Sequence, residues 1–166
     1  FHMNNTGFVY KETDSKSLSL APFYRYDKDA GKSVLLDDEH EYDKKVASGG
    51  GGLYSTTSDY MKFLDRLMSD SSKTKLYVNQ LPEEVTKIPE GIYPNSGYGY
   101  GVAVKLSTDE SYLPKGSFYW AGLGGTIFWV DPVNNIKVVA MMQMAGGRKS
   151  MEKKIIPLIY KAIQSQ

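Results

Sequence analysis

The stretch between Phe118 and Gln143 constrains the fold most, because two apolar runs flank the turn sequence DPVNN at 131–135. Asp, Pro and Asn favour turns for different physical reasons. Apolar segments joined by so short a connection predict strands that run antiparallel. We therefore expect a sheet of sequential strands near residues 97–107, 117–123, 125–131 and 136–144.

Two amphipathic helices are expected to pack on this sheet. Thr57 can cap the first one, and Asp59 in its first turn suits the helix dipole. Its apolar face is spaced at i, i+3, i+4, i+7 and i+8 and holds Tyr60, Phe63, Leu64, Leu67 and Met68. The last helix, which Ser150 could cap and Pro157 could kink, presents Met151, Ile155, Leu158, Ile159 and Ala162. These elements predict the α+β class, an antiparallel sheet with packing helices.

Composition excludes several classes of function. The 166 residues are 41% hydrophobic and 23% charged, which suits one packed domain or a large piece of one. A net charge of +1 argues against a nucleic-acid surface. There are no cysteines, and His2 and His40 lack metal-ligand spacing, so neither a metal nor a cofactor is expected. No apolar run approaches the roughly 20 residues that a membrane helix needs.

Small residues follow Trp120 at the end of an otherwise bulky strand. Ala121 and Gly122 stand where β-branched and aromatic side chains would be usual. Glycine in a strand often marks the close approach of a ligand or of another backbone. The alternative is that Trp120 is an ordinary packing residue of the sheet.

Four segments in order carry a resemblance to a known family: HMNNTGF, GGGGLYSTTSDYMKFLDRLM, GYGYGV and GGTIFWVDP. They resemble the C-terminal half of the serine β-lactamase and penicillin-binding-protein superfamily, in particular class C β-lactamases and related esterases. The resemblance implies that residues 1–166 are the C-terminal portion of a β-lactamase-like domain, an incomplete fold. The N-terminal half, with the S-x-x-K and Y-x-N motifs, is then expected to precede Phe1.

The same resemblance implies a substrate-binding segment. The family carries a K-T-G motif on an edge strand that lines the cleft, and Trp120, Ala121 and Gly122 stand in its place. The backbone N–H of Leu123 is then implied as one oxyanion-hole donor. Because tryptophan cannot supply a cation to a β-lactam carboxylate, the replacement favours an esterase, peptidase or amidase over a β-lactamase.

No catalytic residue is expected within the chain. S-x-x-K matches at 72–75 and 150–153, and tyrosine motifs at 77–79 and 93–95, are explained by chance. None is expected to begin a buried helix at the floor of a cleft, where the family's serine is held. The chain alone is therefore expected to be inactive.

Three functions stay open at this point. The first is a fragment of a serine hydrolase whose parent acylates a serine on an ester, amide or D-amino-acid peptide. The second is a non-catalytic module of the same fold that binds peptidoglycan-like or other ligands. The third is a carbohydrate-binding domain that uses some of the 13 tyrosines. The expected partners are a small-molecule or peptide substrate, the N-terminal half, and a second copy of the chain that docks at or beside the 117–123 strand. The resemblance implies a periplasmic or extracellular location.

Overall fold

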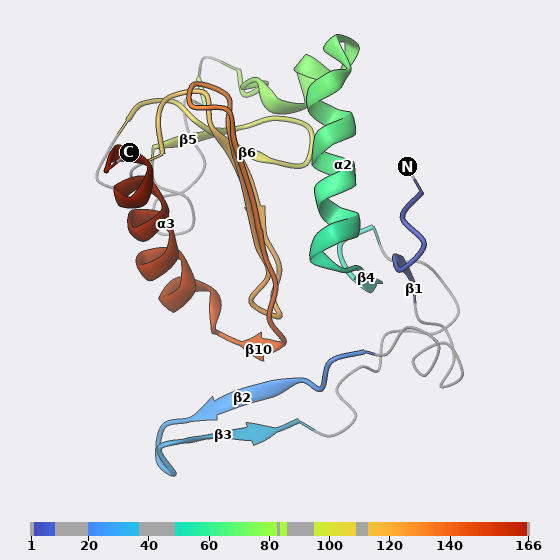
Figure 1. Cartoon of the computed structure of the whole chain (residues 1–166), viewed down its shortest axis with the longest axis vertical. Helices are drawn as coiled ribbons and strands as arrows, with labels where there is room; N and C mark the ends of the chain where they lie inside the picture. Colours follow the sequence, from blue (N-terminus) through green and yellow to red (C-terminus); the bar gives the residue numbers. More distant parts are fainter. Residues whose placement is uncertain are drawn as a thin grey trace.

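A five-stranded antiparallel sheet forms the centre of the structure, a computed structural model (Figure 1). Its strand order is β5-β6-β7-β8-β9. The structure describes residues 2–8, 20–36, 49–82, 84–85, 95–108 and 113–165. The side chains of residues 71, 73 and 148–151 are not described. His40 and the first two residues of the 93–95 motif lie outside the described residues. The strands are β5 (Ser96–Tyr98), β6 (Ala103–Lys105), β7 (Phe118–Ala121), β8 (Ile127–Asp131) and β9 (Ile136–Ala140). The α+β class and the antiparallel meander are confirmed.

The single strand expected at 97–107 is wrong, because this segment is the hairpin β5–β6. The two strands pair antiparallel from Ser96 opposite Lys105 to Tyr98 opposite Ala103. Gly99 donates its N–H to the carbonyl of Val102 at 2.8 Å, and the chain reverses between them. The glycines in this segment therefore mark a turn.

The expectation that the segment after residue 117 is an edge strand is also wrong. Strand β7 pairs with β6 on one side and with β8 on the other. It ends at Ala121, and the following residues form a turn in which the N–H of Gly122 bonds the carbonyl of Thr126 at 2.9 Å. The edges of the central sheet are β5 and β9.

Two helices cover opposite faces of the sheet, α2 (Thr57–Ser69) and α3 (Arg148–Gln164). Figure 1 shows the sheet edge-on between them. Side chains alternate along each strand, so each face supplies its own core cluster. The cluster beneath α2 contains Leu64, Leu67, Val104, Phe118, Phe128 and Val130. The cluster beneath α3 contains Ala103, Leu113, Tyr119, Ile127, Trp129, Ile156 and Tyr160.

The helix starts differ from the expected positions. Thr56, not Thr57, caps α2, and its hydroxyl accepts the backbone N–H three residues on at 3.2 Å. This places the acidic residue Asp59 at the third helical position, where a carboxylate suits the helix dipole. Helix α3 begins at Arg148 rather than after Ser150, and it continues through Pro157.

The buried face of α3 is rotated from the face expected from the sequence. Ile156 and Tyr160, four residues apart, are buried against the sheet. Ile155 and Ile159 pack against the core cluster as expected, but Leu158 is 64% exposed and Ala162 is exposed as well. The apolar stripe of α2 is as expected, with Leu64 and Leu67 buried and its other members packed around them.

A buried carboxylate joins α3 to the turn after β8. Asp131 is fully buried and accepts the Tyr160 hydroxyl at 2.7 Å. The same carboxylate accepts the backbone N–H groups of Val133 and Asn134 at 2.9 and 3.0 Å and the Asn134 amide at 2.6 Å. The DPVNN turn is therefore both a tight connection and the anchor of the C-terminal helix.

Smaller elements complete the fold. β1 (Gly7–Phe8) pairs with β4 (Leu53–Tyr54), and a 3₁₀ helix spans Ser71–Tyr77. The hairpin of β2 (Tyr24–Asp27) and β3 (Lys32–Leu35) extends away from the central sheet (Figure 1). It is joined to the rest through parallel pairing of β2 with β10 (Met144–Ala145). Within the described ranges, no helix has the length and apolar character required to span a membrane.

The outer side of β9 predicts self-association. Among the described residues no strand pairs with that side, and all five residues of β9 are partly exposed. An unpaired edge is a template for pairing with another chain. We expect the 166-residue chain to dimerise at micromolar concentration, with β9 rather than β7 in the contact. Sedimentation equilibrium measures this, and a stable monomer with a cooperative thermal melt would contradict it.

Candidate functional site

A glycine-rich turn follows β7 and exposes two backbone donors. The turn is closed by the bond from the Gly122 N–H to Thr126 and by one from the Gly125 N–H to the Gly122 carbonyl at 3.1 Å. Between them, the N–H groups of Leu123 and Gly124 have no acceptor among the described residues. The Leu123 side chain is 87% exposed. The turn therefore presents free amides to whatever occupies the space beside it.

Met142 packs tightly against this turn. A Cβ built on Gly125, whose φ is +93°, would lie 2.5 Å from the Met142 Cγ atom. A Cβ on Gly147 would lie 2.5 Å from the Met142 sulfur. Both distances are far below a normal contact, so the methionine side chain fills the space that these two glycines leave. The conformation of the turn thus depends on a residue that follows β9.

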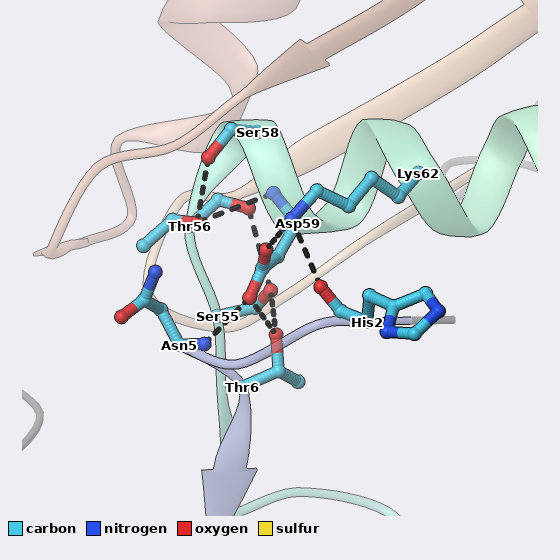
Figure 2. A network of polar contacts seen from close by, with 8 residues as sticks. All are labelled: His2, Asn5, Thr6, Ser55, Thr56, Ser58, Asp59 and Lys62. Atoms are coloured by element: carbon cyan, nitrogen blue, oxygen red, sulfur yellow. Dashed lines mark hydrogen bonds and ion pairs between the residues drawn. The ribbon is translucent and has the colours of Figure 1, made fainter.

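A second wall is held together by the buried carboxylate of Asp59 (Figure 2). One oxygen accepts the Asn5 backbone N–H at 2.7 Å and the Thr6 hydroxyl at 3.2 Å. The other accepts the Lys62 ammonium at 2.7 Å. The Asp59 N–H in turn donates to the Thr56 hydroxyl. The N-terminal segment is therefore fixed to the start of α2.

The pKa of Asp59 lies below its usual range. The hydrogen bond from Lys62 is the main cause, burial opposes it, and the bonds from Asn5 and Thr6 support it. The ionised carboxylate consequently stabilises the folded chain above its ordinary pKa of about 3.9. This contribution is lost as the pH falls through the lowered pKa of the folded state.

Replacing Asp59 by Asn is expected to lower the melting temperature at pH 7, because the uncharged amide loses the Lys62 ion pair and brings an N–H₂ group toward other donors. The difference from wild type should shrink as the pH falls below about 4 toward the lowered pKa of the folded state, because the unfolded chain takes up a proton there before the folded carboxylate does. Thermal melts followed by circular dichroism between pH 3 and 7 measure both effects. A difference independent of pH would contradict the assigned ionisation.

A pocket of about 660 Å³ lies between the two walls, within the usual range for small-molecule sites. One wall consists of Asn5, residues 50–56 and Tyr60. The other consists of residues 122–124, Thr126 and residues 141–143, and Leu20, Ala21 and Phe23 close the pocket beside the β2–β3 hairpin. None of the described lining residues is acidic, basic or a histidine.

The structure separates the four sequence-predicted binding residues into two pairs. Gly122 and Leu123 line the pocket. Trp120 and Ala121 are partly buried and are not among its described lining residues. The Trp120 ring instead meets Tyr98 edge-on, with 5.4 Å between centroids. A direct role in substrate binding stays a prediction for all four.

Sequence reasoning missed several lining residues. The sequence predicts Tyr60 only as part of the apolar face of a helix, and the four glycines at 49–52 enter only through the segment that carries the family resemblance. Met142 and Gln143 were placed inside a strand that in fact ends at Ala140. The glycine run was the one signal that could have pointed to residues 50–56, since a backbone without side chains leaves room for a ligand.

The chance motifs lie away from the pocket where the structure describes them. The Ser72 side chain is exposed, and its hydroxyl donates to Asp70 at 2.6 Å. Tyr77 stacks on Phe118 at 4.6 Å, and the Asn79 amide oxygen accepts the Tyr98 N–H at 3.0 Å. These are structural contacts. The described residues also contain no group of three or more His, Cys, Asp or Glu side chains placed to hold a metal ion.

Comparison with known sequences gives a family match over most of the chain. Residues 2–157 match the family model described as Beta-lactamase. Protein Rv1367c and Uncharacterized protein MT1414, both of Mycobacterium tuberculosis, are each 26% identical over 162 residues. Each match covers 85% of this chain and 40% of the mycobacterial protein, so the chain spans less than half of these relatives.

Solved structures share the fold at low sequence identity. A simvastatin synthase (LovD) from Aspergillus terreus, the LovD6 mutant, superposes with a TM-score of 0.79 at 17% identity. The superposition covers 95% of this chain and 46% of that one. EstCE1, described as a hydrolase with promiscuous acyltransferase activity, superposes with a TM-score of 0.64 at 21% identity, covering 91% of this chain and 45% of EstCE1.

Proposed function

The chain belongs to the Beta-lactamase family, and on that premise we propose that it forms the C-terminal wall of a serine hydrolase active site. The observation that carries the proposal is the free Leu123 N–H at the wall of the pocket. In this proposal the nucleophile comes from sequence outside these 166 residues. The family relatives, more than twice as long as the part that is matched, have room for such a segment.

The chemistry is acyl transfer through a serine ester. The serine oxygen bonds to the substrate carbonyl carbon while a base accepts its proton. The carbonyl oxygen becomes an oxyanion, which the Leu123 N–H stabilises by a hydrogen bond. The bond to the leaving group then breaks with return of a proton, and water cleaves the acyl-serine in the second half-reaction. Leu123 supports both half-reactions because each has a tetrahedral oxyanion.

An ester is the favoured substrate class. Trp120 stands where the related β-lactamases carry a lysine, and it offers no cation to a β-lactam carboxylate. The structural neighbours are a hydrolase with promiscuous acyltransferase activity and a synthase, which supports acyl transfer as the reaction. An amide or a D-amino-acid peptide is the alternative substrate.

Labelling tests the proposal on the product of the complete gene. A fluorescent fluorophosphonate is expected to label the protein covalently, because it reacts with activated serines. A fluorescent penicillin is expected not to label it. Labelling by penicillin would assign the protein to the penicillin-recognising group, and labelling by neither probe would overturn the proposal.

The 166-residue chain by itself is expected to hydrolyse neither nitrocefin nor p-nitrophenyl esters above background. Ser72 hydrogen-bonds to Asp70 outside the pocket, and Ser55, which lines the pocket, hydrogen-bonds to the Thr6 hydroxyl and the Thr56 carbonyl, so neither serine is paired with a histidine, lysine or tyrosine base among the described residues. The measurement is a spectrophotometric assay of the purified chain. Turnover that disappears in a Ser72→Ala or Ser150→Ala variant would show that a nucleophile had been misjudged as a chance motif.

A second candidate function is a non-catalytic binding module. It is favoured by the fact that the described residues form a pocket of ligand size without a catalytic group of their own. This candidate requires that the complete gene lacks an intact S-x-x-K motif. The gene sequence and the fluorophosphonate experiment together distinguish the two functions.

A further inference from the structure

Tyr60 is anchored between the first turn of α2 and the central sheet. Its ring lies 5.2 Å from the ring of Phe128 on β8 and 5.5 Å from Phe63 on its own helix, centroid to centroid. Such tilted and edge-on contacts are favourable geometries for aromatic pairs. The side chain also lines the pocket. The ring is thus held by the core while one part of the residue borders the ligand space.

The Tyr60 hydroxyl has no hydrogen-bond partner among the described residues. The hydroxyl is not among the fully buried polar atoms that lack a partner, so it can be reached by solvent or by a ligand. Burial raises the pKa of Tyr60, so the phenol keeps its proton at neutral pH. The residue therefore offers the pocket a neutral hydrogen-bond donor.

Two of the other polar side chains on this wall are engaged in the fold. The Thr56 hydroxyl caps α2, and the Ser55 hydroxyl bonds the Thr6 hydroxyl at 2.8 Å. The ion pair of Asp59 and Lys62 lies behind the wall rather than among its lining residues. No described lining side chain could balance the charge of a bound carboxylate or ammonium. Burying such a charge without a partner is strongly unfavourable.

Apolar side chains line both walls of the pocket and the side beside the β2–β3 hairpin. Leu53 and Leu123 are more than half exposed at its walls, and Phe23 and Met142 are partly buried lining residues. Methionine adapts its shape to irregular apolar ligands. The walls therefore suit a hydrocarbon chain, and the neutral donors, which are the Tyr60 hydroxyl and the free N–H groups of Leu123 and Gly124, can orient an oxygen on it.

We propose that this pocket binds the uncharged aliphatic acyl part of an ester substrate, and that the Tyr60 hydroxyl donates a hydrogen bond to a carbonyl or ester oxygen of that ligand. The identification of the ligand as a substrate rests on the proposed function. The binding chemistry itself does not require a nucleophile, so it can be measured on the chain as it is.

The test uses three probes of equal chain length, 2-octanone, octanoate and 1-octene, titrated at pH 7 into the ¹⁵N-labelled chain. Shifts of the Gly122 and Gly124 amide signals locate binding at the pocket. The neutral ketone is expected to bind at least about tenfold more tightly than the octanoate anion, which the pocket cannot neutralise. Equal binding of the anion, or no ketone binding, would overturn the proposal.

Tyr60→Phe isolates the hydroxyl, because it keeps the ring packed against Phe63 and Phe128. We expect a roughly fivefold weaker affinity for 2-octanone, the usual effect of one lost hydrogen bond. The affinity for 1-octene, which has no oxygen, should not change, so the ketone-to-alkene ratio corrects for any repacking. Tyr100→Phe is the matched control, since Tyr100 is exposed and outside the described lining.

An unchanged ratio in Tyr60→Phe would exclude the hydroxyl contact. Ketone binding without fluorophosphonate labelling of the complete gene product would leave this site intact and reject the hydrolase. Labelling without ketone binding would support the hydrolase and reject the acyl site. The two proposals can therefore fail separately.

Discussion

Leu123→Pro is expected to reduce the ester hydrolysis rate of the complete gene product about 100-fold or more. Proline has no backbone N–H, so the substitution deletes the one donor that the proposed mechanism aims at the oxyanion. Removal of a single oxyanion-hole donor typically costs a factor of about 100 to 1,000 in kcat. Measurement of kcat and KM with a p-nitrophenyl ester gives the result, and most of the loss should be in kcat.

The Leu123→Pro substitution should remove the N–H without breaking another contact of this residue. The Leu123 side chain is 87% exposed, and its N–H donates to no acceptor among the described residues. The preceding residue is Gly122, which tolerates the restrictions that proline imposes on its neighbour. Leu123→Ala is the control, because it removes the side chain and keeps the N–H. If alanine and proline reduce kcat equally, the amide is not the donor.

Phe118→Ala is expected to lower the free energy of unfolding by about 3–5 kcal/mol, the usual cost of truncating a buried phenylalanine. The ring is fully buried under α2 and stacks on Tyr77 at 4.6 Å. Domains of this kind have only about 5–15 kcal/mol of stability in total. The variant should therefore be close to unfolding at 37 °C, and urea denaturation measures the change in midpoint.

Phe118→Leu should cost clearly less than the alanine variant, since leucine still fills most of the space. Because Phe118 begins the strand that carries the candidate site, Phe118→Ala should also weaken binding at the pocket in proportion to the unfolded fraction. A stable alanine variant with lost binding would instead indicate a local role for the ring.

The elements best predicted from the sequence are those set by periodicity over many residues. The stripe from Tyr60 to Met68 specified α2 because five apolar side chains recur on one face. The DPVNN turn specified the β8–β9 hairpin because proline and asparagine restrict the backbone there. On α3, apolar residues at 155, 156, 158 and 159 fit more than one face, and only packing on Trp129 and Tyr119 selects Ile156 and Tyr160.

The candidate site was predictable only in part. The small residues after Trp120 drew attention to this segment, and Gly122 and Leu123 line the pocket, while their role in substrate binding stays a prediction. The opposite wall depends on the burial of Asp59 and on its bonds to Asn5 and Thr6, which lie more than 50 residues away in the sequence. Local patterns carry no information on such contacts.

The packing around the turn after β7 has a consequence for how the sequence can vary. At Gly125 an added methyl group meets both the Met142 side chain and, at 3.1 Å, the Met144 carbonyl, and the positive φ disfavours any side chain. At Gly116 the space is open, and only the backbone conformation restricts substitution. In a saturation library, position 125 should therefore accept glycine almost alone, while position 123 should accept nearly every residue except proline. Substitutions in this turn would then be concentrated at position 123, whose side chain reaches solvent. The backbone conformation of the surrounding turn would be kept.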